Sequence, residues 1–112
     1  MRVGELYIAN CPFQDRAGSK ERPVIILHIL DDGIAVIESR SRLKSTFDPA
    51  LTINFDDDPY YAGMRLSGVS HFYYENVSVI PIQSLRGRLG AVKRLDFRAL
   101  ARTLGFPLLD GE

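Results

Sequence analysis

The stretch GELYIANCPFQDRAGSKERPVIIL, which spans Gly4 to Leu27, decides the fold of this chain. Two apolar segments, residues 5–11 and 24–30, flank a polar loop that ends in Glu21-Arg22-Pro23. Both segments are rich in β-forming residues and too short for typical helices, so they predict two strands. Pro23 has no amide hydrogen, which suits the first residue of a strand and favours an extended Arg22. The pattern places a cation where a loop enters a sheet, a position suited to an anionic ligand.

Further short strands are expected downstream. Asp31-Asp32-Gly33 lies between two apolar runs, and Asp-Gly at such a place favours a tight hairpin turn. We expect strands at residues 34–39, 50–55, 69–74 and 77–82, with Asn76 in the turn between the last two. The stretch Arg86–Gly90 contains two glycines and is interpreted as a bend.

One helix is expected at the C-terminal end. Apolar residues at helical spacing form a stripe there, made up of Phe97, Leu100, Ala101 and Leu104. Asp96 is the candidate N-cap and Gly105 the candidate stop. Because strands and helices do not alternate, a parallel α/β sheet is disfavoured. A small, strongly bent antiparallel sheet or β-barrel with one C-terminal helix fits the pattern better.

Length and composition indicate an ordinary globular protein. The chain has 112 residues, which suits one domain, with 46% hydrophobic and 25% charged residues. No signal-peptide core or membrane-spanning run is present, so we expect a cytoplasmic protein. Cys11 is the only cysteine, so an intramolecular disulfide is impossible, and its apolar strand favours a small buried hydrophobic role.

Charge is unevenly distributed although it cancels overall. Fourteen basic and fourteen acidic side chains give no net charge, while the segment 86–102 is basic. This asymmetry suits a polyanion or an acidic protein partner, and equally a solvated helix face. If residues 39–44 are extended, Arg40, Arg42 and Lys44 share one face. They could bind a ligand or protect a sheet edge from aggregation.

Two common kinds of site are disfavoured. His28 and His71 are far apart in expected strands with no cysteine beside them, so no metal site is expected. A Gly-x-Ser-x-Gly turn typical of serine hydrolases is absent, and no cofactor motif is found.

The opening segment resembles a known family. Gly4-Glu5 before an apolar strand, Pro12-Phe13, Gly18-Ser19-Lys20 and Arg22-Pro23 resemble the start of MazF/PemK/Kid toxins, and a weaker similarity continues to about residue 105. The resemblance implies an SH3-like small β-barrel of the MazF/PemK/CcdB kind that forms a homodimer. It also implies a toxin of a type II toxin–antitoxin system, neutralised by a cognate antitoxin protein. Such toxins cleave single-stranded RNA or mRNA through the 2′-hydroxyl, without a metal.

The resemblance also suggests site residues. Arg22 matches the family's catalytic arginine, and Ser39, or Ser41 beside it, matches a Thr/Ser at the end of the third strand. The family's acidic residue is not found, because Ser70, His71 and Phe72 align there, so the base is left open between His71, Glu21 and Asp15. The residues expected to contact RNA are Asp15, Lys20, Arg40, Arg42 and Lys44.

Two alternatives remain at this stage. The missing acidic residue favours the same barrel acting without catalysis, as a module that binds RNA or a peptide through its basic edge. A gyrase poison is the second alternative, since a related toxin fold acts in that way through its dimer and its terminal residues.

Overall fold

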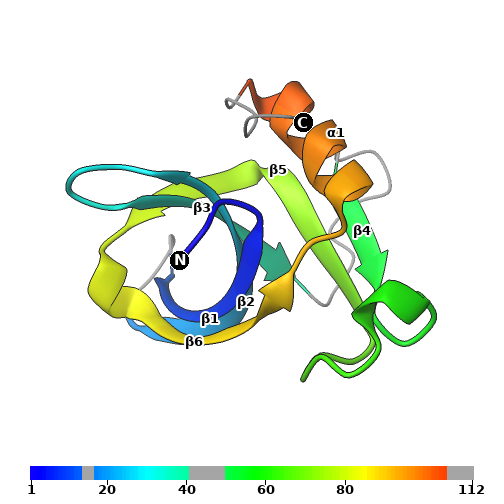
Figure 1. Cartoon of the computed structure of the whole chain (residues 1–112). Coiled ribbons are helices and arrows are strands. Elements are labelled where there is room, and N and C mark those ends of the chain that lie inside the picture. Colours follow the sequence, from blue (N-terminus) through cyan, green and yellow to red (C-terminus); the bar gives the residue numbers. More distant parts are fainter. Residues whose placement is uncertain (14–16, 41–49, 106–112) are drawn as a thin grey trace.

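The computed structural model describes residues 1–13, 17–40 and 50–105, and Figure 1 shows their arrangement. The strands are β1 (Glu5–Pro12), β2 (Ser19–Ile29), β3 (Ile34–Arg40), β4 (Ala50–Asn54), β5 (Val69–Ile80) and β6 (Leu85–Ala91). The helices are the short 3₁₀ turns η1 (Pro59–Tyr61) and η2 (Ile82–Ser84) and the α-helix α1 (Arg94–Leu104).

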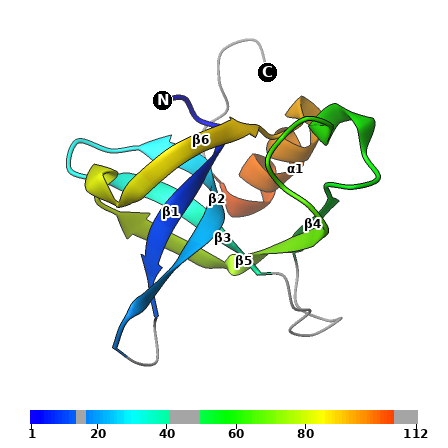
Figure 2. The same ribbon diagram turned by 90° about the horizontal axis from the view of Figure 1, so that it is seen from below.

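All six strands form one antiparallel sheet in the order β4-β5-β3-β2-β1-β6. The sheet curls strongly on itself, and α1 lies close to β4 and β5 (Figures 1 and 2). The expected class, mainly β with a small bent sheet and a C-terminal helix, is therefore confirmed. Among the described helices, none has the length and apolar character needed to cross a membrane.

The predicted hairpin between the second and third strands is confirmed. Ile29 pairs with Ile34, and the Leu30 amide donates to the Gly33 carbonyl at 2.9 Å across the turn. Gly33 is also required by packing, because an added Cβ would lie 2.9 Å from Cγ1 of Val79. The turn conformation and the close packing against β5 therefore both favour glycine at position 33.

The turn expected at Asn76 is wrong. Residues 69–80 form the single strand β5. Its Val77 pairs with Ile37 of β3, and its Phe72 pairs with Ser39 of β3. Residues 73–76 of β5 therefore lie opposite Glu38 alone, so the strand bulges where we expected it to end. Asn76 is buried within this bulge, and the pairing with β3 on both sides overrides the turn preference of asparagine.

The bend expected over residues 86–90 is also wrong, because this segment belongs to the edge strand β6. Gly87 and Gly90 pair with Ile8 and Leu6 of β1. An added Cβ at Gly90 would lie 2.5 Å from Met64 Cε, so close packing explains this glycine in a strand.

Two apolar clusters cover opposite sides of the central strands. Ile25, Leu27 and Ile37 belong to the cluster that packs against α1, whereas Val24, Ile26 and Val36 belong to the other cluster. Successive side chains of a strand point to opposite faces, which explains the division. We call these sides the helix face and the arginine face, the latter because Arg22 shares the alternation of Val24.

The helix is close to prediction but begins earlier. Phe97, Leu100 and Ala101 are buried, and Gly105 ends α1 in the left-handed conformation with φ 77°. Asp96 is not the N-cap, because Lys93 holds that position and Asp96 lies in the first turn. The Asp96 carboxylate instead accepts a hydrogen bond from the Tyr61 hydroxyl, so it binds η1 and does not cap the helix.

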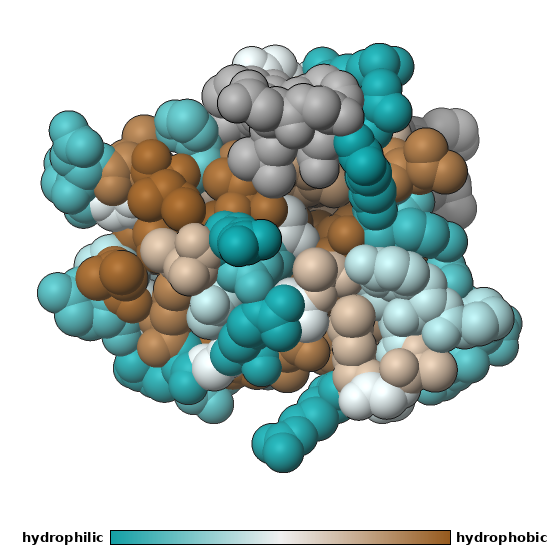
Figure 3. All heavy atoms as spheres, in the orientation of Figure 1, coloured by the Kyte–Doolittle hydropathy of each residue, from teal (hydrophilic) through white to brown (hydrophobic). Residues whose placement is uncertain are grey.

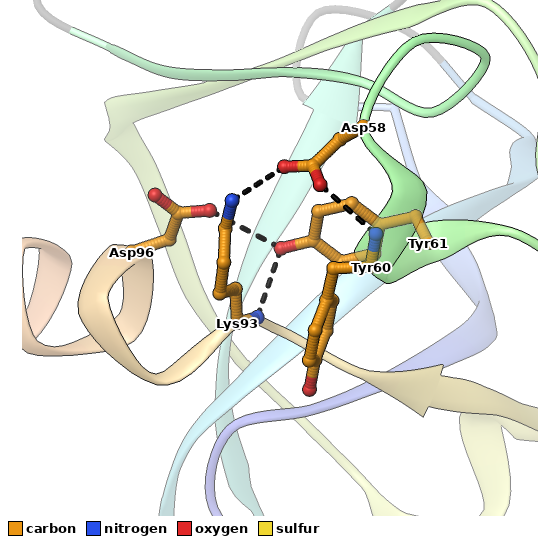
Figure 4. Close-up of polar contacts among 5 residues, drawn as sticks. All are labelled: Asp58, Tyr60, Tyr61, Lys93 and Asp96. Atoms are coloured by element: carbon orange, nitrogen blue, oxygen red, sulfur yellow. Dashed lines mark hydrogen bonds and ion pairs between the residues drawn. The ribbon is translucent and has the colours of Figure 1, made fainter.

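A small polar network fastens the η1 segment to the start of α1 (Figure 4). The buried Tyr61 hydroxyl accepts a hydrogen bond from the Lys93 amide at 2.9 Å and donates one to Asp96 Oδ2 at 3.2 Å. Lys93 Nζ also forms an ion pair with Asp58. The hydrogen bond from Lys93 lowers the pKa of Asp58, and burial raises the pKa of Tyr61, whose hydroxyl therefore stays protonated as a donor.

Tyr61→Phe is expected to lower the free energy of unfolding by about 1–3 kcal/mol, because the Lys93 amide would lose its acceptor. Tyr60→Phe is the matched control, since the Tyr60 side chain is 48% exposed and the change should stay within about 0.5 kcal/mol. Urea denaturation of both variants measures the difference. Equal values for the two would show that the Tyr61 hydroxyl adds nothing to stability.

Candidate functional site

Arg22 lies inside a strand and not at its entrance. The structure extends β2 back to Ser19, because Lys20 and Glu21 pair with Cys11 and Asn10 of β1. Our expected start of the strand at Pro23 is therefore wrong by four residues. Paired with Ala9 of β1, Arg22 is half-buried, so the surrounding strands fix its backbone.

The guanidinium of Arg22 reaches towards the end of β3. Its Nη1 group donates a hydrogen bond to the main-chain carbonyl of Ser39 at 3.4 Å. The β1–β2 hairpin and the end of β3 lie on the same side of the molecule (Figure 2). Arg22 and Ser39, two residues expected in the site, are thus brought together by the fold.

Glu38 lies beside Arg22 on the arginine face. Glu38 pairs with Val24, which stands two residues after Arg22 in β2, so the three share one face by strand alternation. Only 7% of the Glu38 surface is exposed. We did not expect this residue in the site, because the sequence suggested serines at the end of the third strand.

Cys11 lies close to the same two charged groups. Burial first, and then the hydrogen bond and charge of Glu38, raise the pKa of the Cys11 thiol to about 12, while the charge of Arg22 opposes this shift. Cys11 is 1% exposed, which confirms the buried, hydrophobic role expected for it. The Glu38 carboxylate and the Arg22 guanidinium therefore both lie near the Cys11 thiol, on the same side of the sheet.

Two buried donors lie on this face without a hydrogen-bond partner in the described structure: Asn76 Nδ2 and Arg40 Nε. Asn76 precedes Val77, which pairs with Ile37, so Asn76 lies across from Glu38. Arg40 follows Glu38 by two residues and shares its face by alternation. Unsatisfied buried donors are uncommon, and each calls for an explanation, such as a bound water, an ion or a catalytic role.

The remaining candidates are placed differently. Ser39 pairs with Phe72 of the helix-face cluster, so its side chain alternates away from Glu38, and only its carbonyl contacts Arg22. His71 pairs with Arg40 and with Thr52, and its Nδ1 lies 3.0 Å from Thr52 Oγ1.

Glu21 does not join the group around Arg22. By alternation it lies on the opposite face, and its carboxylate is 3.8 Å from Arg86 of β6. Lys20 is exposed near the hairpin end, two residues before Arg22 on the same face. The candidates that lie outside the described residues are Asp15, Ser41, Arg42 and Lys44.

The sequence did contain a signal for Glu38. The segment Ile34–Ile37 is wholly apolar and buried, and Glu38 follows it directly. A carboxylate that continues a buried strand is an exception that invites a functional explanation. Asn76 gave no such signal, because asparagine between two apolar runs is also typical of a turn.

A separate cavity of about 400 Å³ lies between the start of β1, η1 and the start of α1, and Glu5, Tyr60 and Arg88 help to line it. Glu5 and Arg88 form an ion pair across it. Burial opposes ionisation of Glu5, but the hydrogen bond from Arg88 prevails and lowers its pKa. These charges compensate each other, so this cavity offers a less reactive arrangement than the arginine face.

An exposed apolar patch lies at another place, near the β2–β3 turn and η2, as the brown spheres on the left of Figure 3 show. Ile29, Leu30 and Ile82 are 43%, 38% and 57% exposed. Together with Met1 they line a shallow pocket of about 250 Å³. Patches of this kind are typical of contact surfaces and not of reaction centres.

No group of three or more metal-ligating side chains is found among the described residues. The arginine face instead combines one buried carboxylate with guanidinium and amide donors. Guanidinium groups bind phosphate oxygens through several parallel hydrogen bonds, and a nearby carboxylate can accept a proton. The arrangement is chemically suited to a phosphodiester.

Comparison with known proteins supports the fold described above, a curled antiparallel sheet with one C-terminal helix. Neither a scan of protein families nor a search of curated proteins finds a match. Among solved structures, the chain is similar to the Mycobacterium tuberculosis toxin MazF-mt6, with a TM-score of 0.65, 20% identity, and coverage of 90% of this chain and 92% of that one.

Two further solved structures show the same likeness. An endoribonuclease in complex with its cognate antitoxin, from a mycobacterial species, has a TM-score of 0.58 and 16% identity, and covers 97% of this chain and 99% of its own. A mycobacterial endoribonuclease has a TM-score of 0.56 and 17% identity, with 97% and 95% covered. At these identities the likeness establishes the fold, which is that of MazF.

Proposed function

We propose that this chain is a MazF-like toxin of a type II toxin–antitoxin system, an endoribonuclease that cleaves single-stranded RNA or mRNA in the cytoplasm. The observation that carries the proposal is the position of Arg22. Arg22 is half-buried, its guanidinium donates a hydrogen bond to the Ser39 carbonyl at the end of β3, and it shares a face with the buried carboxylate of Glu38. The fold supports the proposal, because the similar solved structures are a toxin and endoribonucleases.

The proposed reaction uses the RNA's own 2′-hydroxyl as the nucleophile. Such a reaction requires a base near the 2′-oxygen, a proton for the leaving 5′-oxygen, and donors on the non-bridging phosphate oxygens. Arg22 supplies the donors, since its planar guanidinium stays charged and matches phosphate geometry. Arg40 and Lys20 lie on the same face and would hold neighbouring phosphates. No step in this scheme requires a metal ion.

We further propose that the toxin is a homodimer held inactive by a small antitoxin protein. One of the similar structures is an endoribonuclease bound to its cognate antitoxin, which supports this partner class. Light scattering of the purified protein would measure the dimer. Growth arrest on expression of this chain alone, relieved by a small protein encoded beside it, would support the antitoxin.

The ribonuclease is tested with a long unstructured RNA incubated with wild-type protein, with and without EDTA. We expect discrete fragments under both conditions, each with a 2′,3′-cyclic phosphate at its new 3′ side. Fragments only without EDTA would contradict the metal-free scheme. Intact RNA under both conditions would contradict the enzyme, and tight binding of that RNA would instead support a non-catalytic binding module.

A further inference from the structure

The proposed reaction needs a base, and the sequence left this role open between His71, Glu21 and Asp15. Asp15 lies outside the described residues, and the structure sets the other two apart from Arg22 in different ways. His71 shares the arginine face through its pairing with Arg40, but it lies on β5, two strands from Arg22, and its Nδ1 is 3.0 Å from Thr52 Oγ1 of β4. Glu21 faces away and lies 3.8 Å from Arg86. Among the described residues, a nearer candidate for the base is therefore a group on the arginine face of β3, the strand next to β2.

Glu38 is the buried carboxylate on that face. It stands one strand away from Arg22, opposite Val24, and immediately precedes Ser39, whose carbonyl accepts the hydrogen bond from Arg22. The contact of Arg22 with Ser39 therefore keeps its guanidinium next to the Glu38 backbone. A phosphate bound by Arg22 would lie within reach of the Glu38 side chain.

The surroundings of Glu38 are unusual for a structural residue. Its neighbours on the same face, Val24 and Val36, are completely buried and belong to an apolar cluster. A carboxylate in such a place costs several kcal/mol of solvation unless charged or polar partners compensate it. An apolar residue would pack there at lower cost, so stability alone does not explain Glu38.

Polar groups lie near this carboxylate. The Cys11 thiol of β1 is close enough for Glu38 to raise its pKa and donates to the Ala9 carbonyl at 3.6 Å, while Asn76 lies across from Glu38 on β5 with Nδ2 unpartnered within the described residues. Asn76 is 5% exposed, and its Nδ2 makes no hydrogen bond to any described residue, Glu38 included, so this donor is available to a bound ligand. The bulge of β5 exists at this position and brings Asn76 there.

We infer that Glu38 is the general base of the proposed ribonuclease. This inference rests on the proposed function. The Glu38 carboxylate takes the proton of the 2′-hydroxyl, and the 2′-oxygen forms a bond to phosphorus. The bond from phosphorus to the 5′-oxygen breaks, leaving a 2′,3′-cyclic phosphate. The 5′-oxygen takes a proton from water, and Glu38 returns its proton to solvent. Hydrogen bonds between a catalytic group and its substrate are often long in the free enzyme and shorten when the substrate binds.

The test compares single-turnover cleavage rates and RNA affinities of wild type, Glu38→Gln, His71→Gln and Glu21→Gln on one RNA. We expect Glu38→Gln to slow cleavage by about 10²–10⁴-fold, with RNA affinity within about twofold of wild type. The other two variants should keep rates within about tenfold. Asp31→Asn, in the exposed β2–β3 turn, is the control for loss of one negative charge.

Folding must be separated from chemistry. The thermal midpoint of each variant is measured first, and assays are run well below it. If Glu38→Gln does not fold, Glu38→Ala is assayed with added formate, a small carboxylate that can occupy the vacated space. Restoration of cleavage by formate, but not by chloride, supports the base; no restoration in a folded Glu38→Ala protein overturns it.

The outcomes distinguish this inference from the proposed function. Cleavage by wild type together with a wild-type rate in Glu38→Gln overturns the role of Glu38 and leaves the ribonuclease standing. Loss of rate in His71→Gln or Glu21→Gln alone assigns the base to that residue and also overturns it. Intact RNA with the wild-type protein overturns both proposals.

Discussion

Arg22→Ala is expected to reduce RNA cleavage by about 10²–10³-fold, because it removes the donors that the site directs at the phosphate. The Arg22 side chain donates a hydrogen bond to the main-chain carbonyl of Ser39 at 3.4 Å, and the Arg22 backbone lies in β2 between β1 and β3. Loss of the side chain therefore leaves the hydrogen-bond pairing of the sheet intact. The measurement is the single-turnover rate on unstructured RNA, with circular dichroism to confirm the fold.

Arg22→Lys separates charge from geometry. Lysine keeps the positive charge but presents a single ammonium in place of a planar fork, so we expect it to recover only part of the lost rate. Arg86→Ala is the matched control, because this arginine lies on β6 with its side chain 48% exposed and is paired with Glu21. A similar loss in Arg86→Ala would show that general charge, and not the position of Arg22, controls cleavage.

The fold was largely predictable because its signals are local. The β1–β2 and β2–β3 hairpins follow from alternating apolar runs and from an Asp-Gly turn, and the helix follows from a regular apolar stripe. The end of α1 at Gly105 follows from the ability of glycine to adopt a left-handed conformation. Each of these features depends on residues that are close in sequence.

The wrong predictions lie at positions whose conformation depends on residues that are distant in the sequence. Asn76 is held in a strand by pairing of its flanks with β3, and Gly90 is accommodated in β6 because Met64 packs over it. Neither partner can be inferred from the local pattern. The local sequence therefore predicted a turn at Asn76 and a bend at Gly90, whereas both residues lie in strands.

The site shows the same division. Arg22 was predicted for the site from its place before Pro23, a local pattern, whereas its position inside β2, paired with Ala9, depends on β1. That the Glu38 side chain, and not that of Ser39, shares the face of Arg22 could not be predicted, because it depends on strand register, and a shift of one residue moves every side chain to the other face. The pairing of Glu38 with Val24 fixes this register and turns Glu38 to the arginine face.

Leu100→Ala is expected to lower the free energy of unfolding by about 2–5 kcal/mol, since it leaves a cavity in the helix-face cluster. Leu100 is 0% exposed and belongs to the same cluster as Leu6 and Phe72. With Phe97 and Ala101 it forms the buried side of α1. Removing it weakens the contact between α1 and the sheet. Urea denaturation, followed by circular dichroism, measures the change.

Leu95→Ala is the control, because it removes the same atoms from the same helix at a side chain that is 72% exposed. Its effect should stay within about 0.5 kcal/mol. Equal destabilisation by the two variants would contradict the packing of α1 described above. Leu100 lies on the helix face, whereas Arg22 and Glu38 lie on the arginine face, so Leu100→Ala should retain the cleavage rate under conditions where it is folded. Loss of stability without loss of rate would separate the residues that hold the fold from those that perform the proposed reaction.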